Sequence, residues 1–180
     1  MQEQTPEQPQ AQVQARDAVD DIVDQWARER PDLDLWAMAL VGRYNRFQSH
    51  VESALREYFS LHGLDFSEFD VLATLRRSGE PYELNARALL KSAMVTSGAI
   101  TNRVDKLSAK GLVERRPCAT DRRAVLIRLT PAGKELIDRT VAGHVRNEEN
   151  VMSALTPEER VTLDGLLRKL LIAKEGSPQT

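Results

Sequence analysis

The stretch that decides the fold runs from residue 96 to residue 133 and reads TSGAITNRVDKLSAKGLVERRPCATDRRAVLIRLTPAG. In its first part, Ile100, Val104 and Leu107 recur at helical spacing, which indicates one buried helix face. Thr96 or Ser97 is a suitable residue to start this helix, and Gly111 is typical of the position just after a helix. The first part therefore predicts a helix of about three turns that ends near residue 110.

The second part of the stretch changes to a β pattern. Residues 112–116 and 124–129 are β-prone segments, and residues 117–123 between them combine turn chemistry with positive charge. Thr130 followed by Pro131 is typical of a helix N-cap with proline at the first helical position. We predict a β-hairpin with a basic tip, followed directly by another helix.

Apolar spacing predicts further helices on both sides of this stretch. Ser67 and Asn85 are candidate N-caps, and Thr156 with Glu159 forms a capping-box pattern. The helices are expected over residues 17–29, 33–61, 67–77, 86–91, 131–152 and from 157 onward. Two short helices, a longer helix and a hairpin make a winged helix-turn-helix, so the predicted fold class is mainly α (α+β) with long outer helices.

The outer helices carry apolar stripes but have little else in the chain to pack against, so a second copy is their natural partner. We expect a tail over 1–15, N-terminal helices for dimerisation and a ligand cleft over 16–62, and a DNA-binding lobe over 63–130. C-terminal dimerisation helices over 131–175 and a tail over 176–180 complete this organisation. The Gln- and Pro-rich residues 1–15 are expected to be disordered.

Composition and charge narrow the function classes. The net charge is −2, but residues 103–128 hold eight basic and three acidic side chains, so one short segment carries a positive field. No run of 18 apolar residues predicts a membrane helix, and the first residues do not resemble a signal peptide. With one cysteine, Cys118, the expectation is a cytoplasmic protein without an internal disulfide.

The helix that starts near Ser97 has a face suited to DNA. Gly98, Asn102 and Asp105 lie roughly opposite the buried stripe, with Ser97 and Thr101 between. Small and polar side chains allow close approach in a major groove, where an asparagine can pair with adenine. The expected DNA-binding residues on this helix are Ser97, Gly98, Thr101, Asn102 and Lys106.

The tip of the hairpin adds Asp121, Arg122 and Arg123. Arginines at a turn fit the minor groove or the adjacent phosphates, and Asp121 can orient one of them through a charge-assisted hydrogen bond. An ordinary solvent-exposed helix face and a weak surface ion pair are the plainer interpretations of the two features. A basic hairpin directly after a pair of helices is more specific than either feature alone.

Several segments together resemble the MarR family of transcriptional regulators over residues 33–172. They are LNARAL at 84–89, TNRVDKL at 101–107, KGLVER at 110–115, DRR at 121–123 and LTPAG at 129–133. The resemblance implies a homodimer of winged helices that binds palindromic double-stranded DNA and usually represses transcription. It also implies that the terminal helices form the dimer interface and that Asp121 supports Arg123.

A ligand site is suggested first by Arg103, which lies near the buried stripe of its helix and away from the DNA face. Its guanidinium either pairs with a carboxylate and ties the lobe to the long helices, or binds an anion. Residues 17–35 resemble the extra N-terminal helix of a urate-responsive subgroup of the family. That resemblance implies a pocket of Trp26, Asp70, Arg103 and Arg115, with Trp36 as an alternative to Trp26, for urate or another small organic anion.

Other function classes have weaker support. The chain has no phosphate loop, nucleophile elbow or metal motif, so we expect no enzyme, no cofactor and no metal site. His50, His62 and His144 are too widely spaced to suggest metal ligation, and redox sensing by Cys118 is a minor alternative. The main alternative is a winged-helix module that binds protein partners, and a steep loss of affinity with salt would distinguish DNA binding from it.

Overall fold

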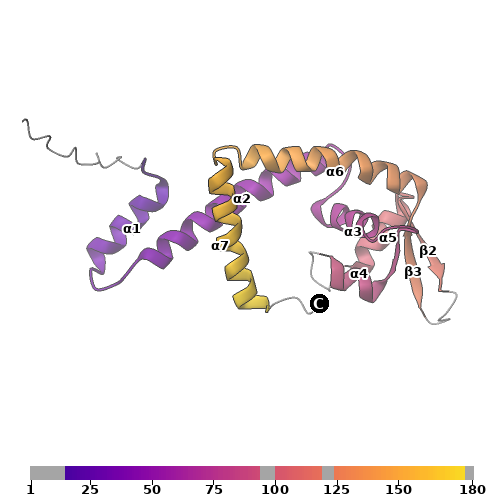
Figure 1. Ribbon diagram of the computed structural model, residues 1–180, viewed down its shortest axis with the longest axis horizontal. Coiled ribbons are helices and arrows are strands. Elements are labelled where there is room, and N and C mark those ends of the chain that lie inside the picture. The colour runs from indigo at the N-terminus through magenta and orange to yellow at the C-terminus, as the bar shows by residue number, and fades with distance from the viewer. Residues whose placement is uncertain (1–14, 94–99, 119–123, 177–180) are drawn as a thin grey trace, which may run out of the picture. The chain divides into compact units, whose positions relative to one another are not determined.

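The computed structural model describes residues 15–93, 100–118 and 124–176, and all structural statements concern these residues. In chain order the elements are α1 (Ala18–Glu29), α2 (Trp36–Ser60), α3 (Phe66–Arg77), β1 (Glu83–Asn85), α4 (Ala86–Ser92), α5 (Ile100–Ala109), β2 (Val113–Pro117), β3 (Val125–Leu129), α6 (Pro131–Val151) and α7 (Pro157–Glu175). The expected class, mainly helical with a small antiparallel sheet in a winged helix-turn-helix, is confirmed (Figure 1).

The chain divides into two compact units, one up to His50 and one from Val51 onward. In the first unit, Val19 of α1 is 3% exposed, and a Cβ added to Gly42 of α2 would lie 3.1 Å from its Cγ1. Arg43 of α2 forms ion pairs with Asp17 at 2.7 Å and Asp20 at 2.5 Å. The burial of Val19 beside Gly42 and this ionic cluster therefore attach α1 to the beginning of α2.

The second unit holds the hydrophobic core. Leu72 and Leu75 of α3, Leu89 of α4 and Leu107 of α5 are fully buried, together with Phe59 from the end of α2. Fully burying a side chain of this kind contributes about 1.5–3 kcal/mol to stability. The buried stripe that the sequence predicts for α5 is confirmed.

The sheet has three strands in the order β1-β3-β2, all antiparallel. The predicted hairpin is β2 and β3, with Val113 opposite Leu129 and Pro117 opposite Val125. Strand β1 was not predicted; it pairs with the other edge of β3, Glu83 opposite Arg128. This extra strand connects the end of the α3–α4 link to the hairpin.

Most predicted helix starts are confirmed. Asn85, Thr130 and Thr156 are N-caps, and Thr156 and Glu159 form the capping box. The assignment of Ser67 as the cap of α3 was wrong. Asp65 is the cap and Glu68 completes its box, while the hydroxyl of Ser67 donates to Asp65 Oδ1 at 2.5 Å. An aspartate one turn before the apolar face accepts the Glu68 N–H, which leaves Ser67 in the first turn.

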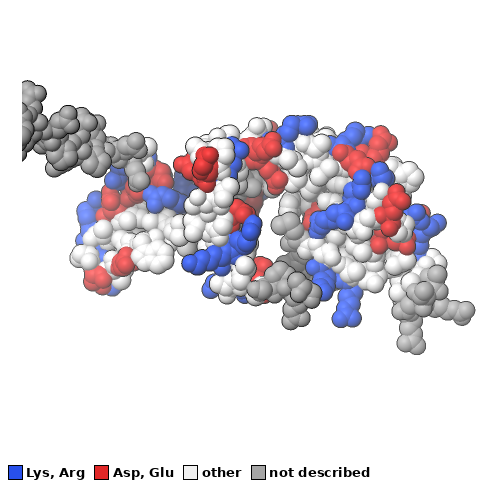
Figure 2. Space-filling view, in the orientation of Figure 1, with Lys and Arg blue, Asp and Glu red and all other residues white. Residues whose placement is uncertain are grey.

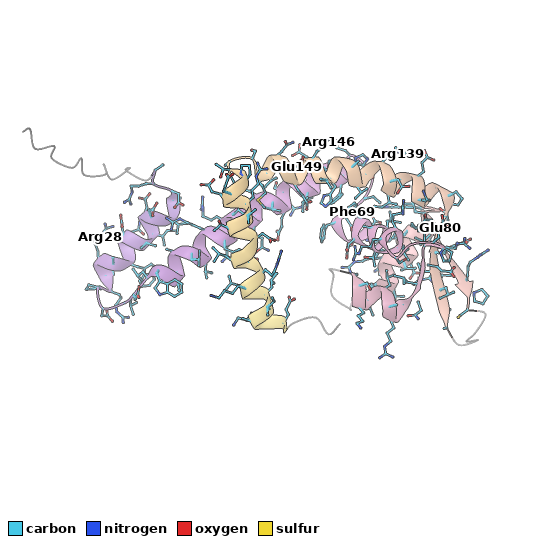
Figure 3. All side chains as sticks on the ribbon, viewed as in Figure 1. Arg28, Phe69, Glu80, Arg139, Arg146 and Glu149 are labelled. Atoms are coloured by element: carbon cyan, nitrogen blue, oxygen red, sulfur yellow. The ribbon has the colours of Figure 1, made fainter. Side chains whose placement is uncertain are left out.

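Helix α6 packs along α3 and the end of α2. The hydroxyl of Tyr58 donates to the Thr140 carbonyl at 2.7 Å, and the ring of Phe69 meets His144 edge-on with centroids 4.7 Å apart. Figure 3 labels Phe69 on α3. Arg76 and Lys134 both contact Asp138, at 2.6 and 2.7 Å. In contrast, α7 has no buried residue. No helix among the described residues is long and apolar enough to cross a membrane.

Candidate functional site

Helix α5 presents a polar face to solvent and an apolar face to the core. Ile100, Val104 and Leu107 are at most 3% exposed, whereas Thr101 and Asn102 are exposed. Lys106 and Asp105 are exposed on the same helix. The two other predicted contact residues of this helix, Ser97 and Gly98, lie outside the described residues. The described part of the face is therefore accessible to a partner along the helix.

The hairpin extends this accessible side of the lobe. Its last pairing joins Pro117 to Val125, and the Cys118 N–H donates to the Ala124 carbonyl at 3.1 Å. The predicted tip residues Asp121, Arg122 and Arg123 fall outside the described residues. In Figure 2, Lys and Arg atoms are visible at the end of the lobe where α4 and α5 lie.

Arg115 of β2 joins the hairpin to α5. Its Nη2 lies 2.6 Å from Asp105 Oδ1, and the two side chains are 40% and 57% exposed. Exposed ion pairs of this kind contribute only about 0–1 kcal/mol. The structure thus places Arg115, a predicted ligand residue, in a solvent-accessible pair that a competing anion can reach.

Asp70 lies on the buried face of α3 and is only 3% exposed. A carboxylate taken out of water is costly unless charged or polar groups stabilise it. Arg77, two turns further along α3, places Nη1 3.9 Å from Asp70 Oδ1. The predicted site carboxyl group is therefore buried beside an arginine that sequence reasoning did not single out.

Arg103 on α5 is half-buried, and its Nη1 is buried without a hydrogen-bond partner among the described residues. The plainer prediction, in which a carboxylate pairs with Arg103, is not supported within that part of the chain. Leaving a buried guanidinium nitrogen unpaired is costly, and such groups in native structures call for an explanation. A donor of this kind suits a bound anion.

The four predicted ligand residues are distributed over both units. Asp70 lies on α3, Arg103 on α5 and Arg115 on β2, all in the second unit. Helix α3 packs on α5, and β2 is the element that follows α5 in the chain. Trp26 lies on α1 of the first unit and is 44% exposed, and its competitor Trp36 is 68% exposed. The second unit therefore groups the three charged members on neighbouring elements.

Two surface hollows lie elsewhere. One of about 680 Å³ is lined by Arg16, Asp17, Asp20 and Arg43 in the first unit. The other, about 380 Å³, lies between α6 and α7 and includes Val145, Met152 and Leu167. Neither includes a predicted ligand residue. Within the described residues no group of three or more His, Cys, Asp or Glu side chains is arranged to hold a metal ion.

Two charged contacts near the site were missed at the sequence level. Arg77 donates to the Ser92 carbonyl at the end of α4 in addition to facing Asp70. Lys110, after α5, contacts the buried Glu68 carboxylate at 2.7 Å and the Gly63 carbonyl at 2.9 Å. Both contacts join segments far apart in the sequence, so no local spacing could have indicated them.

Comparisons with known proteins agree with this geometry. A family model described as the MarR family matches residues 62–124. The transcriptional regulator PecS of Dickeya dadantii is 41% identical over 152 residues, covering 84% of this chain and 92% of PecS. A crystal structure of a variant MarR from Escherichia coli complexed with operator DNA has a TM-score of 0.67 at 30% identity, covering 77% of this chain and 99% of that one.

A further similar structure is of a regulator whose DNA binding is regulated by a small molecule. The structure that describes regulation of DNA binding of Bordetella bronchiseptica BpsR by 6-hydroxynicotinic acid has a TM-score of 0.65 at 25% identity. It covers 72% of this chain and 90% of the BpsR chain.

Proposed function

Because this chain belongs to the MarR family of transcriptional regulators, we propose that it is a repressor that a small organic anion releases from palindromic operator DNA. The observation that carries this proposal is α5, which buries Ile100, Val104 and Leu107 and exposes Thr101 and Asn102 beside the hairpin. A polar helix face next to a basic hairpin is the arrangement with which winged helices read a major groove and its flanking phosphates.

The relatives named above are transcriptional regulators and not enzymes, which confirms the expectation of a non-enzymatic protein. We assign base reading to Thr101 and Asn102, and phosphate contacts to Lys106, Ser97 and Gly98. At the hairpin tip, Arg122 and Arg123 approach the minor groove, and Asp121 orients Arg123. In this proposal the protein acts on DNA in the cytoplasm.

The proposed repressor is a homodimer. Helix α7 buries none of its residues within one chain, although Val161, Leu166 and Leu170 are 75%, 57% and 58% exposed. A helix with apolar side chains around much of its surface is normally covered. A second copy covers this helix in the proposed dimer, which also provides the two-fold symmetry that a palindrome requires.

The proposed effector is urate or another flat organic anion. The unpaired Arg103 Nη1 and the exposed Arg115 supply positive charge, and the buried Asp70 lies on the helix that packs against α5. Trp26, or Trp36 in its place, supplies a stacking surface for the ring. BpsR, which responds to another heterocyclic acid in the structure described above, supports this ligand class. A difference in free energy of a few kcal/mol between the two states is enough to release DNA.

The test is a DNA-binding titration on a duplex that the wild-type protein selects from a random-sequence pool. Fluorescence anisotropy with that duplex is repeated with urate, and a scrambled duplex is the control. Selective binding that urate weakens supports both parts of the proposal. Selective binding that urate leaves unchanged rejects urate as the effector, and failure to select any sequence favours the protein-interaction alternative.

A variant pair identifies the reading residue. Asn102→Ala should weaken binding to the selected duplex by about 1–3 kcal/mol, roughly 5- to 150-fold, with little effect on the scrambled duplex. Arg139→Gln is the matched control, because Arg139 is exposed on α6 and pairs only with the exposed Glu135 among the described residues. Equal loss on both duplexes would remove Asn102 from base reading.

A further inference from the structure

Arg77 connects the buried Asp70 to the helix that precedes α5. One guanidinium nitrogen lies 3.9 Å from Asp70 Oδ1, and the other donates to the carbonyl of Ser92, the last residue of α4. The last carbonyls of a helix have no partner within that helix, so an arginine that binds one of them fixes the position of the helix end. One side chain therefore lies beside a buried carboxyl group and binds a helix terminus.

The location of that terminus gives the contact its consequence. The chain leaves α4 at Ala93 and enters α5 at Ile100, so the end of α4 is the last described anchor before the helix that carries Asn102. Helix α3, which holds Asp70 and Arg77, packs on both α4 and α5. A change in the position or charge balance of Arg77 can therefore reach α5 through the packing of α3 and α4 against it.

The chemistry of Arg77 makes it sensitive to an anion near Asp70. The guanidinium divides its attraction between a carboxylate and a neutral carbonyl, and the carboxylate is the stronger acceptor because it is charged. A second negative charge beside Asp70 alters this balance, either by displacing the carboxylate or by attracting the arginine itself. Arg77 is also 49% exposed at its side chain, so it has room to move.

We propose that Arg77 is a positioning residue that couples Asp70 to the end of α4 and thereby sets the orientation of α5 in DNA binding. This inference rests on the proposed function for its effector, but the link from Asp70 to α4 concerns DNA affinity alone and holds without any effector. Arg77 touches neither DNA nor ligand in this role; it acts through the α4 terminus.

The first arm of the test uses no effector. Operator affinity on the selected duplex is measured for the wild type, Asp70→Asn, Arg77→Gln and the double variant. If Arg77 acts through Asp70, each single variant loses affinity severalfold. The double variant then loses about as much affinity as the single variant that binds DNA more weakly. If the losses multiply, the two residues act independently and the proposal is overturned.

The second arm uses urate as the probe. For Arg77→Gln, the ratio of DNA affinities without and with urate should fall towards one, while urate binding followed by tryptophan fluorescence changes less than about threefold. Arg77→Lys keeps the charge near Asp70 but has no planar fork for two acceptors, so it should restore only part of the ratio. An unchanged ratio in Arg77→Gln with a responsive wild type overturns the coupling role.

Two controls keep the interpretations apart. Arg139→Gln removes an exposed arginine from α6 and should leave both the cycle and the ratio at wild-type values. If the role of Arg77 is only structural, Arg77→Gln should lower the melting temperature, and the affinity losses of Asp70→Asn and Arg77→Gln should multiply in the double variant. A wild type that ignores urate rejects the proposed effector, and the effector-free cycle then decides the role of Arg77 by itself.

Discussion

At the scale of the residue, Gly133 has the tightest surroundings of the described glycines. A Cβ added there would lie 2.0 Å from the Leu112 carbonyl oxygen, where α6 begins against the residue before β2. A backbone atom cannot move aside as the end of a flexible side chain can. The position is therefore closed to any residue larger than glycine without a shift of α6 or of the hairpin.

Gly133→Ala should therefore lower the free energy of unfolding by roughly 1–3 kcal/mol, the usual cost of overpacking. Urea denaturation followed by circular dichroism measures the change. Ala132→Ser, at the exposed neighbouring position, is the control and should stay within about 0.5 kcal/mol of the wild type. Equal stability of Gly133→Ala and the wild type would show that α6 adjusts freely against Leu112.

Asp138 makes the junction of α3 and α6 sensitive to acid. Hydrogen bonds from Lys134 first, and then from Arg76, hold the pKa of Asp138 below its ordinary value of 3.8. A carboxyl group whose pKa is lowered in the folded state stabilises the protein when the pH is above the ordinary pKa of that group. The contribution is lost as the pH falls through the lowered pKa.

Asp138→Asn should therefore unfold more readily than the wild type at pH 7 and show a smaller further loss of stability when the pH falls below about 4. Urea titrations at a series of pH values measure both effects. Glu135→Gln, an exposed carboxylate on the same helix, is the control. The interpretation is wrong if Asp138→Asn and the wild type lose stability in parallel as the pH falls.

The residue scale also shows what sequence patterns miss. The burial of Asp70 and the unpaired nitrogen of Arg103 come from the packing of α3 on α5, which no spacing within either helix specifies. The resemblance to the urate-responsive subgroup implied both Asp70 and Arg103 as ligand residues, whereas helical geometry alone placed only Arg103 near the core. Arg77 lacked either signal, because its contact with Ser92 at the end of α4 arises only from the fold.

At the scale of the element, α1 is held by few contacts. Val19 is its one buried residue among those described, and Ile22 and Trp26 on the same apolar face are 45% and 44% exposed. The Arg43 guanidinium contributes through Asp17 and Asp20, and its hydrogen bond with Asp17 lowers the pKa of that carboxyl group. Within one chain, α1 is therefore easier to detach than a core helix.

Val19→Ala should speed amide hydrogen exchange across α1 more than Arg43→Gln does. A buried valine contributes about 1.5–3 kcal/mol, whereas water and salt screen exposed ion pairs, so each contributes little. Mass-spectrometric exchange on residues 18–29 gives the comparison, with Arg46→Gln on the exposed surface of α2 as the control. A larger effect from Arg43→Gln would mean that the ionic cluster, and not the apolar contact, holds α1.

Helices were predicted better than strands, for a physical reason. A helix satisfies its backbone within one segment, so apolar spacing and caps such as Asn85, Thr130 and Thr156 reveal it directly. Strand β1 spans three residues, too few for an alternating pattern, and exists because Leu84 pairs with Ile127 far along the chain. Its partner strands were long enough to be recognised from β-branched composition.

At the scale of the whole molecule, the exposed apolar residues of α7 predict a dimer in solution. Sedimentation velocity at micromolar concentration should give twice the chain mass of 20.3 kDa. Leu166→Lys with Leu170→Lys should shift the protein towards monomer and weaken operator binding, because one lobe then meets one half-site. Thr162→Lys on the same helix adds charge at a polar position and is the control. A monomeric wild type would contradict this architecture.

The hairpin also has a role in solubility, through the strand that ends the sheet. Among the described strands β2 pairs with β3 alone, so its other edge has backbone groups that a second chain can join. Glu114, Arg115 and Arg116 are exposed along it, and Pro117 provides no N–H. Charge and proline at a free edge are ordinary protection against strand-to-strand aggregation. Arg115 thus helps to protect this edge in addition to its proposed role in ligand binding. Replacing it with an apolar residue to study the effector would also make the protein more prone to aggregate.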